Sequence, residues 1–258
     1  MMRLAAAVKQ LLDFCYPTAC AACGVSCPES NTPACCETCD AALQALAEIP
    51  SCAKCAKPLA YDRAPCPYCE GRGFRPLDRI VCIGVFDDPL KHLIHQAKYH
   101  RQWMLAEILV DRLAAQKRVQ SLLATTEVLI PVPLHPWRQI ARGYNQADVI
   151  ARQLAGHDRQ TERARRLRVR HPAVRTRRTE TQTHLHSRAK RVENLRGAFA
   201  LVDPASIAGK HVTIVDDVMT TGATLRSYAR VLMSAKPASV SAIVLAIADP
   251  RGKEFEAV

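Results

Sequence analysis

The amino-acid sequence predicts an α/β fold, a parallel sheet flanked by helices, preceded by a small cysteine-rich module. Two observations lead to this prediction. After residue 76, apolar runs alternate with helical patterns, which is typical of parallel strands joined by helical crossovers. All but one of the twelve cysteines lie before residue 70, among prolines and small residues. We therefore place a domain boundary between residues 1–76 and residues 77–258.

The elements of the α/β part follow from the spacing of apolar residues. Runs rich in Val and Ile between turn residues predict strands, and apolar residues three or four positions apart predict helices. The expected strands are residues 79–86, 127–134, 198–202, 211–217 and 239–248. The expected helices are residues 88–99, 103–118, 145–155 and 222–235. Because strands and helices alternate, we expect parallel pairing in a layered domain.

The segment from residue 159 to residue 178 interrupts this alternation. It contains nine arginines, opposed by Glu162 alone, and few apolar residues. Such a composition buries too little apolar surface to form much of a core. We expect a mobile basic excursion there.

Composition narrows the class of protein. The chain has 258 residues, of which 48% are hydrophobic and 23% charged, as in ordinary soluble globular proteins. Residues 1–17 predict an amphipathic helix, in which Lys9 and Asp13 interrupt the apolar stretch that a signal peptide needs. We expect a cytoplasmic protein without membrane insertion. The net charge of +12 favours a polyanionic ligand, either nucleic acid or a phosphorylated small molecule.

Eight of the cysteines form four CxxC pairs. Two thiolates separated by two residues can hold a tetrahedral ion from one side, and a second pair completes its coordination. Crowded cysteines in a chain without an export signal favour metal thiolates over disulfides. We expect two structural zinc ions and hence a double zinc-ribbon module over residues 1–76. The expected ligands are Cys20, Cys23, Cys36 and Cys39 at one site, and Cys52, Cys55, Cys66 and Cys69 at the other.

A strand, two adjacent carboxylates and a threonine-rich turn follow one another in "HVTIVDDVMTTGATL", residues 211–225. Asp216 and Asp217 fall at the carboxyl end of the expected strand, the usual ligand edge of a parallel sheet. Three threonines around Gly222 then enter a helix, whose free N–H groups and dipole attract a phosphate. Carboxylates repel a phosphate, so they must meet hydroxyls or a bound cation. The pattern predicts a ligand of the ribose 5-phosphate kind.

This stretch resembles the phosphoribosyl-pyrophosphate binding loop of type I phosphoribosyltransferases. The resemblance implies that Asp216 and Asp217 hold the ribose 2′ and 3′ hydroxyls and that the residues after them hold the 5′-phosphate. Those residues are Val218, Met219, Thr220, Thr221, Gly222, Ala223 and Thr224. It also implies the sheet of this enzyme class for residues 77–258, and Mg²⁺ bridging the diphosphate and the ribose hydroxyls.

A second resemblance covers nearly the whole chain. The stretch "IPVPLHPWRQIARGYNQA" at residues 130–147, the cysteine module and a trailing pattern of single residues are similar to the ComF family of competence-associated proteins. The trailing residues are Thr179, Gln182, Leu185, Arg191, Asn194, Ala198 and Phe199.

The ComF resemblance implies further site residues. The segment after the strand at 127–134 would form a pyrophosphate loop, made by Leu134, His135, Arg138, Arg142 and Gly143. Lys98 matches a lysine of the family's hood segment. The catalytic residues implied are Asp216, Asp217, Lys98 and Arg142, with Arg177 helping to balance charge.

Three functions agree with these residues. The first is an active phosphoribosyltransferase whose acceptor no residue set identifies. The second is a catalytically silent protein of competence or DNA utilisation, which uses the fold as a scaffold and binds single-stranded DNA or a helicase partner. The third is a sensor of phosphoribosyl pyrophosphate without chemistry. Residues 159–178 contain no Phe, Trp or Tyr, so DNA contact there would be phosphate-directed and salt-sensitive.

Overall fold

The computed structural model describes residues 19–27, 35–62, 64–70, 73–99, 103–135, 137, 139–140, 143–159, 167–177 and 197–248. The helix expected over residues 1–17 lies outside them.

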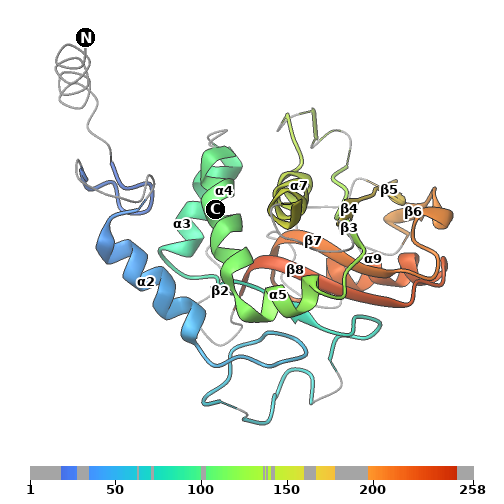
Figure 1. The fold of residues 1–258 in the computed structure, drawn as a ribbon, viewed down its shortest axis with the longest axis horizontal. Helices are drawn as coiled ribbons and strands as arrows, with labels where there is room; N and C mark the ends of the chain where they lie inside the picture. The colour runs from blue at the N-terminus through green and yellow to red at the C-terminus, as the bar shows by residue number, and fades with distance from the viewer. Residues whose placement is uncertain are drawn as a thin grey trace.

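A parallel sheet forms the centre of the α/β part (Figure 1). Its described strands, from one edge to the other, are β1 (Ile80–Val81), β8 (Ser239–Ile247), β7 (His211–Met219), β3 (Val128–Pro131) and β4 (Arg168–Val169). A further short strand, β2 (Gly84–Val85), also pairs with β8. Every pairing in this sheet is parallel, which confirms the predicted fold class.

Helices cover both faces of the sheet. On one face lie α3 (Leu90–Tyr99), α4 (Trp103–Ala115), α5 (Lys117–Leu123) and α7 (Gln146–Arg159), and on the other lies α9 (Ala223–Met233). Successive side chains of a strand point to opposite faces. In β7, Ile214 therefore enters the core beneath α9, whereas Val215 enters the core beneath α7, and both are fully buried.

The two cysteine segments belong to different faces. Cys20 and Cys39 pack with the core of α3, α4 and α7, whereas Cys52 and Cys55 pack with the core beneath α9. Helix α2 (Glu37–Glu48, blue in Figure 1) carries Cys39 of the first segment and leads towards the second. The prediction of a separate unit over residues 1–76 stays a prediction, but each of its described parts shares a core with the sheet.

Most predicted elements occur within a few residues of their expected bounds, with two interruptions. The strand expected over residues 79–86 is two short strands, β1 and β2. The helix expected over residues 103–118 ends at Ala115, and α5 begins two residues later. Gln116 has an extended backbone with ψ of 124°, which no α-helix accommodates.

The described part of the expected mobile basic excursion over residues 159–178 forms short strands, which the sequence does not predict. Within it, β4 pairs with β3, and β5 (Ala173–Arg175) pairs antiparallel with β6 (Phe199–Leu201) outside the main sheet. Leu167 and Ala173 are buried and anchor these strands. The short edge strand is held by backbone hydrogen bonds, which the arginine side chains leave undisturbed. Residues 160–166 lie outside the described part.

Strand β6 also corrects the prediction of parallel pairing. It was expected among the alternating strands and helices but joins the antiparallel β5–β6 pair, followed by a short 3-10 turn, η2 (Pro204–Ser206). In the described part of the chain, no helix combines the length and the apolar character that crossing a membrane requires.

Candidate functional site

Asp216 and Asp217 lie in β7 beyond the point where it pairs with β3. Val215 is the last residue of β7 in that pairing, and its carbonyl also accepts a hydrogen bond of 2.9 Å from the Val132 N–H. Strand β8 continues alongside and pairs Asp216 with Val244. Ligands of open α/β sheets bind where strands separate at their carboxyl ends. Both aspartates are half-buried at such a position.

The two carboxylates bind neighbouring backbone groups. Oδ1 of Asp216 accepts a hydrogen bond of 2.9 Å from the Asp217 N–H, and Oδ1 of Asp217 accepts one of 2.6 Å from the Val218 N–H. Asp217 also lines a small cavity on the α7 face, together with Tyr144 and Gln146. Carboxylates at such a position are chemically suited to ribose hydroxyls or to a hard cation such as Mg²⁺.

Gln146 was not predicted as a site residue. It is buried beside Asp217, and its Nε2 has no hydrogen-bond partner among the described residues. A buried donor without a partner is costly, so such groups often mark places where a ligand or water completes the hydrogen bonding. The only signal in the sequence is that Gln146 ends the "RGYNQ" stretch. A glutamine there is equally compatible with the first residue of a helix, so its residue type alone does not identify it as a site residue.

The segment after β7 turns sharply into α9. Gly222 is the residue before the helix and has φ of 73°, in the left-handed region that favours glycine. A Cβ at this position would lie 3.3 Å from the ring of Phe74. Oγ1 of Thr221 accepts a hydrogen bond of 3.4 Å from the Ala223 N–H. The first N–H groups of α9 have no partners within the helix, so the turn presents amides and hydroxyls that fit an anion.

The segment after β3 is the one expected to hold a diphosphate. Leu134 and His135 are half-buried at the carboxyl end of β3. Nδ1 of His135 accepts a hydrogen bond of 3.3 Å from the Trp137 N–H. Gly143 has φ of 78°, and its N–H donates to the Gln139 carbonyl over 2.8 Å. These residues therefore lie at the same edge of the sheet as the acidic pair.

Several predicted site residues cannot be placed among these. Arg138 and Arg142 lie outside the described residues, as does the side chain of Lys98, whose backbone is part of α3. Arg177 is exposed just after β5. Their roles stay predictions.

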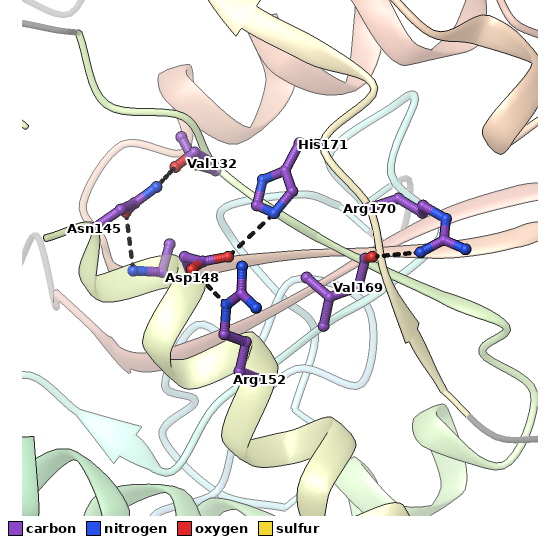
Figure 2. Close-up of polar contacts among 8 residues, drawn as sticks. Val132, Asn145, Asp148, Arg152, Val169, Arg170 and His171 are labelled. Carbon is purple, nitrogen blue, oxygen red and sulfur yellow. Dashed lines mark hydrogen bonds and ion pairs between the residues drawn. The ribbon is translucent and has the colours of Figure 1, made fainter.

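A polar network fixes the start of α7 against the ends of β3 and β4 (Figure 2). Nδ2 of Asn145 donates to the Val132 carbonyl over 3.0 Å. Asp148 accepts a hydrogen bond of 2.7 Å from Nε of Arg152, and its other oxygen lies 3.2 Å from Nε2 of His171. The network joins the "RGYNQ" segment to both neighbouring strands, and so positions the Gln146 side of the small cavity.

The eight CxxC cysteines form two groups of four, in the grouping that their spacing predicts. Within each group the sulfur atoms all lie within 4.8 Å of one another. Cys52 and Cys69 are 3.7 Å apart, and Cys55 and Cys66 are 3.5 Å apart. Four sulfurs bound at about 2.3 Å to one tetrahedral ion lie about 3.8 Å from each other. The spacing therefore fits a zinc ion in each group.

Three other described thiols, Cys27, Cys35 and Cys82, lie outside the two groups of four. Burial raises the pKa of the Cys35 thiol to about 11, and desolvation raises the pKa of Cys82 to about 12. Cys27 donates to the Val25 carbonyl over 3.0 Å.

A cavity of about 300 Å³ lies at the opposite edge of the sheet, at the amino ends of the strands. Four of its polar side chains form hydrogen bonds in two pairs. Thr126 and Thr213 hydroxyls are 2.8 Å apart, and Nδ1 of His211 lies 2.8 Å from Oγ of Ser239. Because these groups are satisfied within the protein, the carboxyl edge is the better candidate for ligand binding.

A parallel sheet with an acidic pair at the end of one strand, followed by a glycine turn into a helix, defines a protein of the type I phosphoribosyltransferase fold. The comparison with known families agrees, because residues 101–257 match the family model described as "Phosphoribosyl transferase domain".

Curated relatives narrow this class. The chain is 33% identical over 198 residues to "DNA utilization protein YhgH" of Salmonella typhimurium, covering 73% of this chain and 80% of the relative. It is 34% identical over 200 residues to "Competence protein F" of Haemophilus influenzae, covering 75% and 83%. A shorter match, 34% over 120 residues, joins 46% of this chain to 43% of "Competence protein ComFC" of Bacillus subtilis. The chain belongs to the ComF family.

Proposed function

We propose that this protein binds phosphoribosyl pyrophosphate with Mg²⁺ at the carboxyl edge of its sheet, and that it serves DNA uptake or DNA utilisation. The observation that carries the binding proposal is the position of the acidic pair, beyond the β3 pairing and directly before the left-handed Gly222 and the start of α9. The names of the relatives support the biological role.

Each part of this ligand has a matching part of the edge. The 5′-phosphate would bind the N–H groups and hydroxyls of residues 220–224, and the ribose hydroxyls would bind Asp216 and Asp217. The diphosphate would lie along Leu134, His135 and Gly143, with Arg138 and Arg142 in the same segment. Mg²⁺ would come with the ligand and neutralise part of its charge.

The reaction that fits this ligand is transfer of the phosphoribosyl group. The bond between ribose C1′ and the pyrophosphate oxygen breaks, the bond from C1′ to an acceptor forms, and pyrophosphate leaves. The protein contributes by orienting the diol through its carboxylates and by stabilising the departing diphosphate with backbone N–H groups and arginines.

Calorimetric titration tests the binding proposal. Phosphoribosyl pyrophosphate with Mg²⁺ is titrated into the wild type, into the double variant Asp216→Asn with Asp217→Asn, and into the control Asp203→Asn. Asp203 is exposed, and its side chain caps η2 by accepting from the Ser206 N–H, which Asn can also do. We expect binding to wild type and control and none to the double variant. Equal affinity of all three proteins would reject the assigned site.

We also propose that both cysteine clusters bind structural zinc. The sulfur spacing of each group supports this, and each of these groups fills a tetrahedral shell by itself, which leaves no coordination position for substrate.

A second candidate function is direct binding of single-stranded DNA. Arg168, Arg170 and Arg177 are exposed along the β4–β5 segment, and relatives carry names of DNA utilisation and competence. Contacts from arginine to phosphate weaken steeply with salt. Binding of a labelled oligothymidine should fall with rising salt and fall further in Arg168→Ala with Arg170→Ala. Affinity independent of both salt and these arginines would exclude this surface.

A further inference from the structure

Lys57 is a buried cation that joins two parts of the molecule. One is the second cysteine cluster, and the other is the proposed phosphate turn, residues 220–224. The cluster consists of Cys52, Cys55, Cys66 and Cys69. Lys57 is 3% exposed, and of the described charged residues it alone is buried. Its Nζ donates a hydrogen bond of 3.0 Å to the Thr220 carbonyl and another to the Ala248 carbonyl. Thr220 follows β7 and Ala248 follows β8, so one ammonium group ties together the ends of the two central strands.

The cysteine cluster fixes where Lys57 lies. Lys57 comes two residues after Cys55, and its carbonyl accepts a hydrogen bond of 2.9 Å from the Cys52 N–H. The Ala56 N–H donates to the Cys52 carbonyl over 2.8 Å, and Ala56 has a left-handed φ of 55°. The chain therefore curls tightly around the sulfur group. This curl directs the Lys57 side chain into the core beneath α9.

The hydrogen bond to Thr220 fixes the orientation of a peptide group in the turn. In a trans peptide the carbonyl and the following N–H point in opposite directions. With its carbonyl directed at Lys57, the Thr220–Thr221 peptide directs the Thr221 N–H away from the cysteine cluster. Lys57 also places a positive charge behind the turn, where burial limits screening by solvent.

Phe74 makes a second contact between the same segment and the turn. Its ring lies against Gly222, where an added Cβ would be 3.3 Å away, and the Arg226 guanidinium lies 5.9 Å from the ring centroid. Phe74, Cys52 and Cys66 belong to one apolar core with Met219 and Ala223. The second cluster is thus part of the packing that supports the turn.

The described residues of the first cluster lie in a different core from residues 220–224. Cys20 and Cys39 pack on the other face of the sheet, and Asp40 of α2 pairs with Arg112 of α4. This difference provides a matched comparison within one chain, since the two clusters have the same ligands but only the second lies in the core of the turn.

We propose that Lys57 is a positioning residue for the phosphate turn, and that metal occupancy of the second cysteine cluster controls, through Lys57, the affinity of the site for its phosphorylated ligand. The link to ligand affinity rests on the proposed function; the link to the order of the turn does not. The first cluster does not control this affinity.

Amide hydrogen exchange of residues 218–224 tests the link without any ligand. In Lys57→Met, which keeps side-chain length but loses charge and donors, exchange should become about tenfold faster, the effect expected when a charged donor is lost. The control is Lys54→Met, because Lys54 lies between Cys52 and Cys55 but is exposed. Zinc content should stay at the wild-type value in both variants. Unchanged exchange in Lys57→Met would overturn the proposal.

Loss of a cluster gives a second comparison, which decides the matter if Lys57→Met does not fold. Cys69→Ser should accelerate exchange of residues 218–224, whereas Cys23→Ser, in the first cluster, should leave it at the wild-type rate. Equal effects of the two substitutions would show that the clusters act only through general stability and would contradict the proposal.

The mutual effect of zinc binding and ligand binding supplies a further readout, which a lysine with a purely structural role would not change. If zinc in the second cluster strengthens ligand binding, the ligand must strengthen zinc binding by the same factor. Phosphoribosyl pyrophosphate with Mg²⁺ should therefore reduce the transfer of zinc from the second cluster to a competing chelator in wild type and in Cys23→Ser, but not in Lys57→Met. A wild type that binds no ligand rejects the proposed function, while the exchange experiment still decides the role of Lys57. Ligand protection of zinc that persists in Lys57→Met would overturn the proposal.

Discussion

Gly222 and Gln146 show how the surroundings of a single residue determine which side chain can occupy its position. Gly222 combines a left-handed backbone with contact to Phe74, so both its conformation and its lack of a side chain are used. Gln146 is buried, its amide nitrogen has no hydrogen-bond partner among the described residues, and it lines the same small cavity as Asp217. The first arrangement shapes the turn into α9, and the second makes Gln146 a candidate contact for the proposed ligand.

Substitution of Gly222 by Ala should weaken both folding and binding. The left-handed backbone costs an L-residue about 1 to 2 kcal/mol, and the new Cβ also presses on Phe74. Urea unfolding should show this loss, together with weaker binding of phosphoribosyl pyrophosphate. Gly156→Ala in α7 is the control, because a Cβ there meets nothing within 4 Å and helix propensity rises. A Gly222→Ala protein as stable as wild type would contradict the described turn.

Gln146→Leu should separate stability from binding. Leucine removes a buried donor without a partner, so the free energy of unfolding should stay constant or rise by about 1 kcal/mol. Ligand affinity should fall, because the donor beside Asp217 is lost. Urea unfolding and calorimetric titration measure the two effects. Reduced stability with unchanged affinity would assign Gln146 a purely structural role.

The contact between α2 and β2 shows how closely the cysteine segments are joined to the sheet. A Cβ on Gly84 would lie 2.6 Å from the backbone carbonyl oxygen of Leu46, an atom that cannot rotate away. The end of α2 therefore packs directly on the β2 backbone. Glycine at this position permits that approach.

Gly84→Ala should force α2 and β2 apart. Overpacking of this kind costs about 1 to 3 kcal/mol, and the loss should appear as a lower urea midpoint with a similar slope. Amides of α2 should exchange faster, while those of β7 stay protected until global unfolding. Wild-type stability of Gly84→Ala would show that the α2 contact is looser than described.

The sequence predicts the strands and helices well where apolar spacing is regular, as in β7, α9 and β8. It fails in the arginine-rich segment, because two-residue and three-residue strands need only backbone hydrogen bonds and a few buried residues such as Leu167 and Ala173. The acidic pair and the CxxC pairs are visible because their chemistry depends on spacing. The roles of Lys57 and Gln146 cannot be predicted from the sequence. The burial of Lys57 and the unpartnered amide nitrogen of Gln146 arise only in the folded structure.

The molecule as a whole places one cysteine cluster on each side of its sheet. The first packs with α3, α4 and α7, and the second with α9 and the end of β7. Loss of metal from the first cluster should therefore destabilise the core of α3, α4 and α7, and loss from the second should destabilise the core beneath α9.

Cys52→Ser should lower bound zinc towards one equivalent per chain and destabilise the α9 face. Structural zinc contributes directly to the free energy of folding, so the melting temperature should fall as well. Zinc measured by mass spectrometry of the native protein gives the count, and Cys82→Ser is the control outside both clusters. Retention of two tightly bound zinc ions in Cys52→Ser would contradict the ligand assignment.

The position of the ligand is best measured by hydrogen exchange of the zinc-loaded 258-residue chain with and without phosphoribosyl pyrophosphate and Mg²⁺. We expect the ligand to protect amides of residues 218–224 and of the segment after β3, while the amino ends of the strands around His211 keep their exchange rates. Protection confined to the cavity around Thr126 and His211, or the absence of any ligand effect on residues 218–224, would contradict the assigned site.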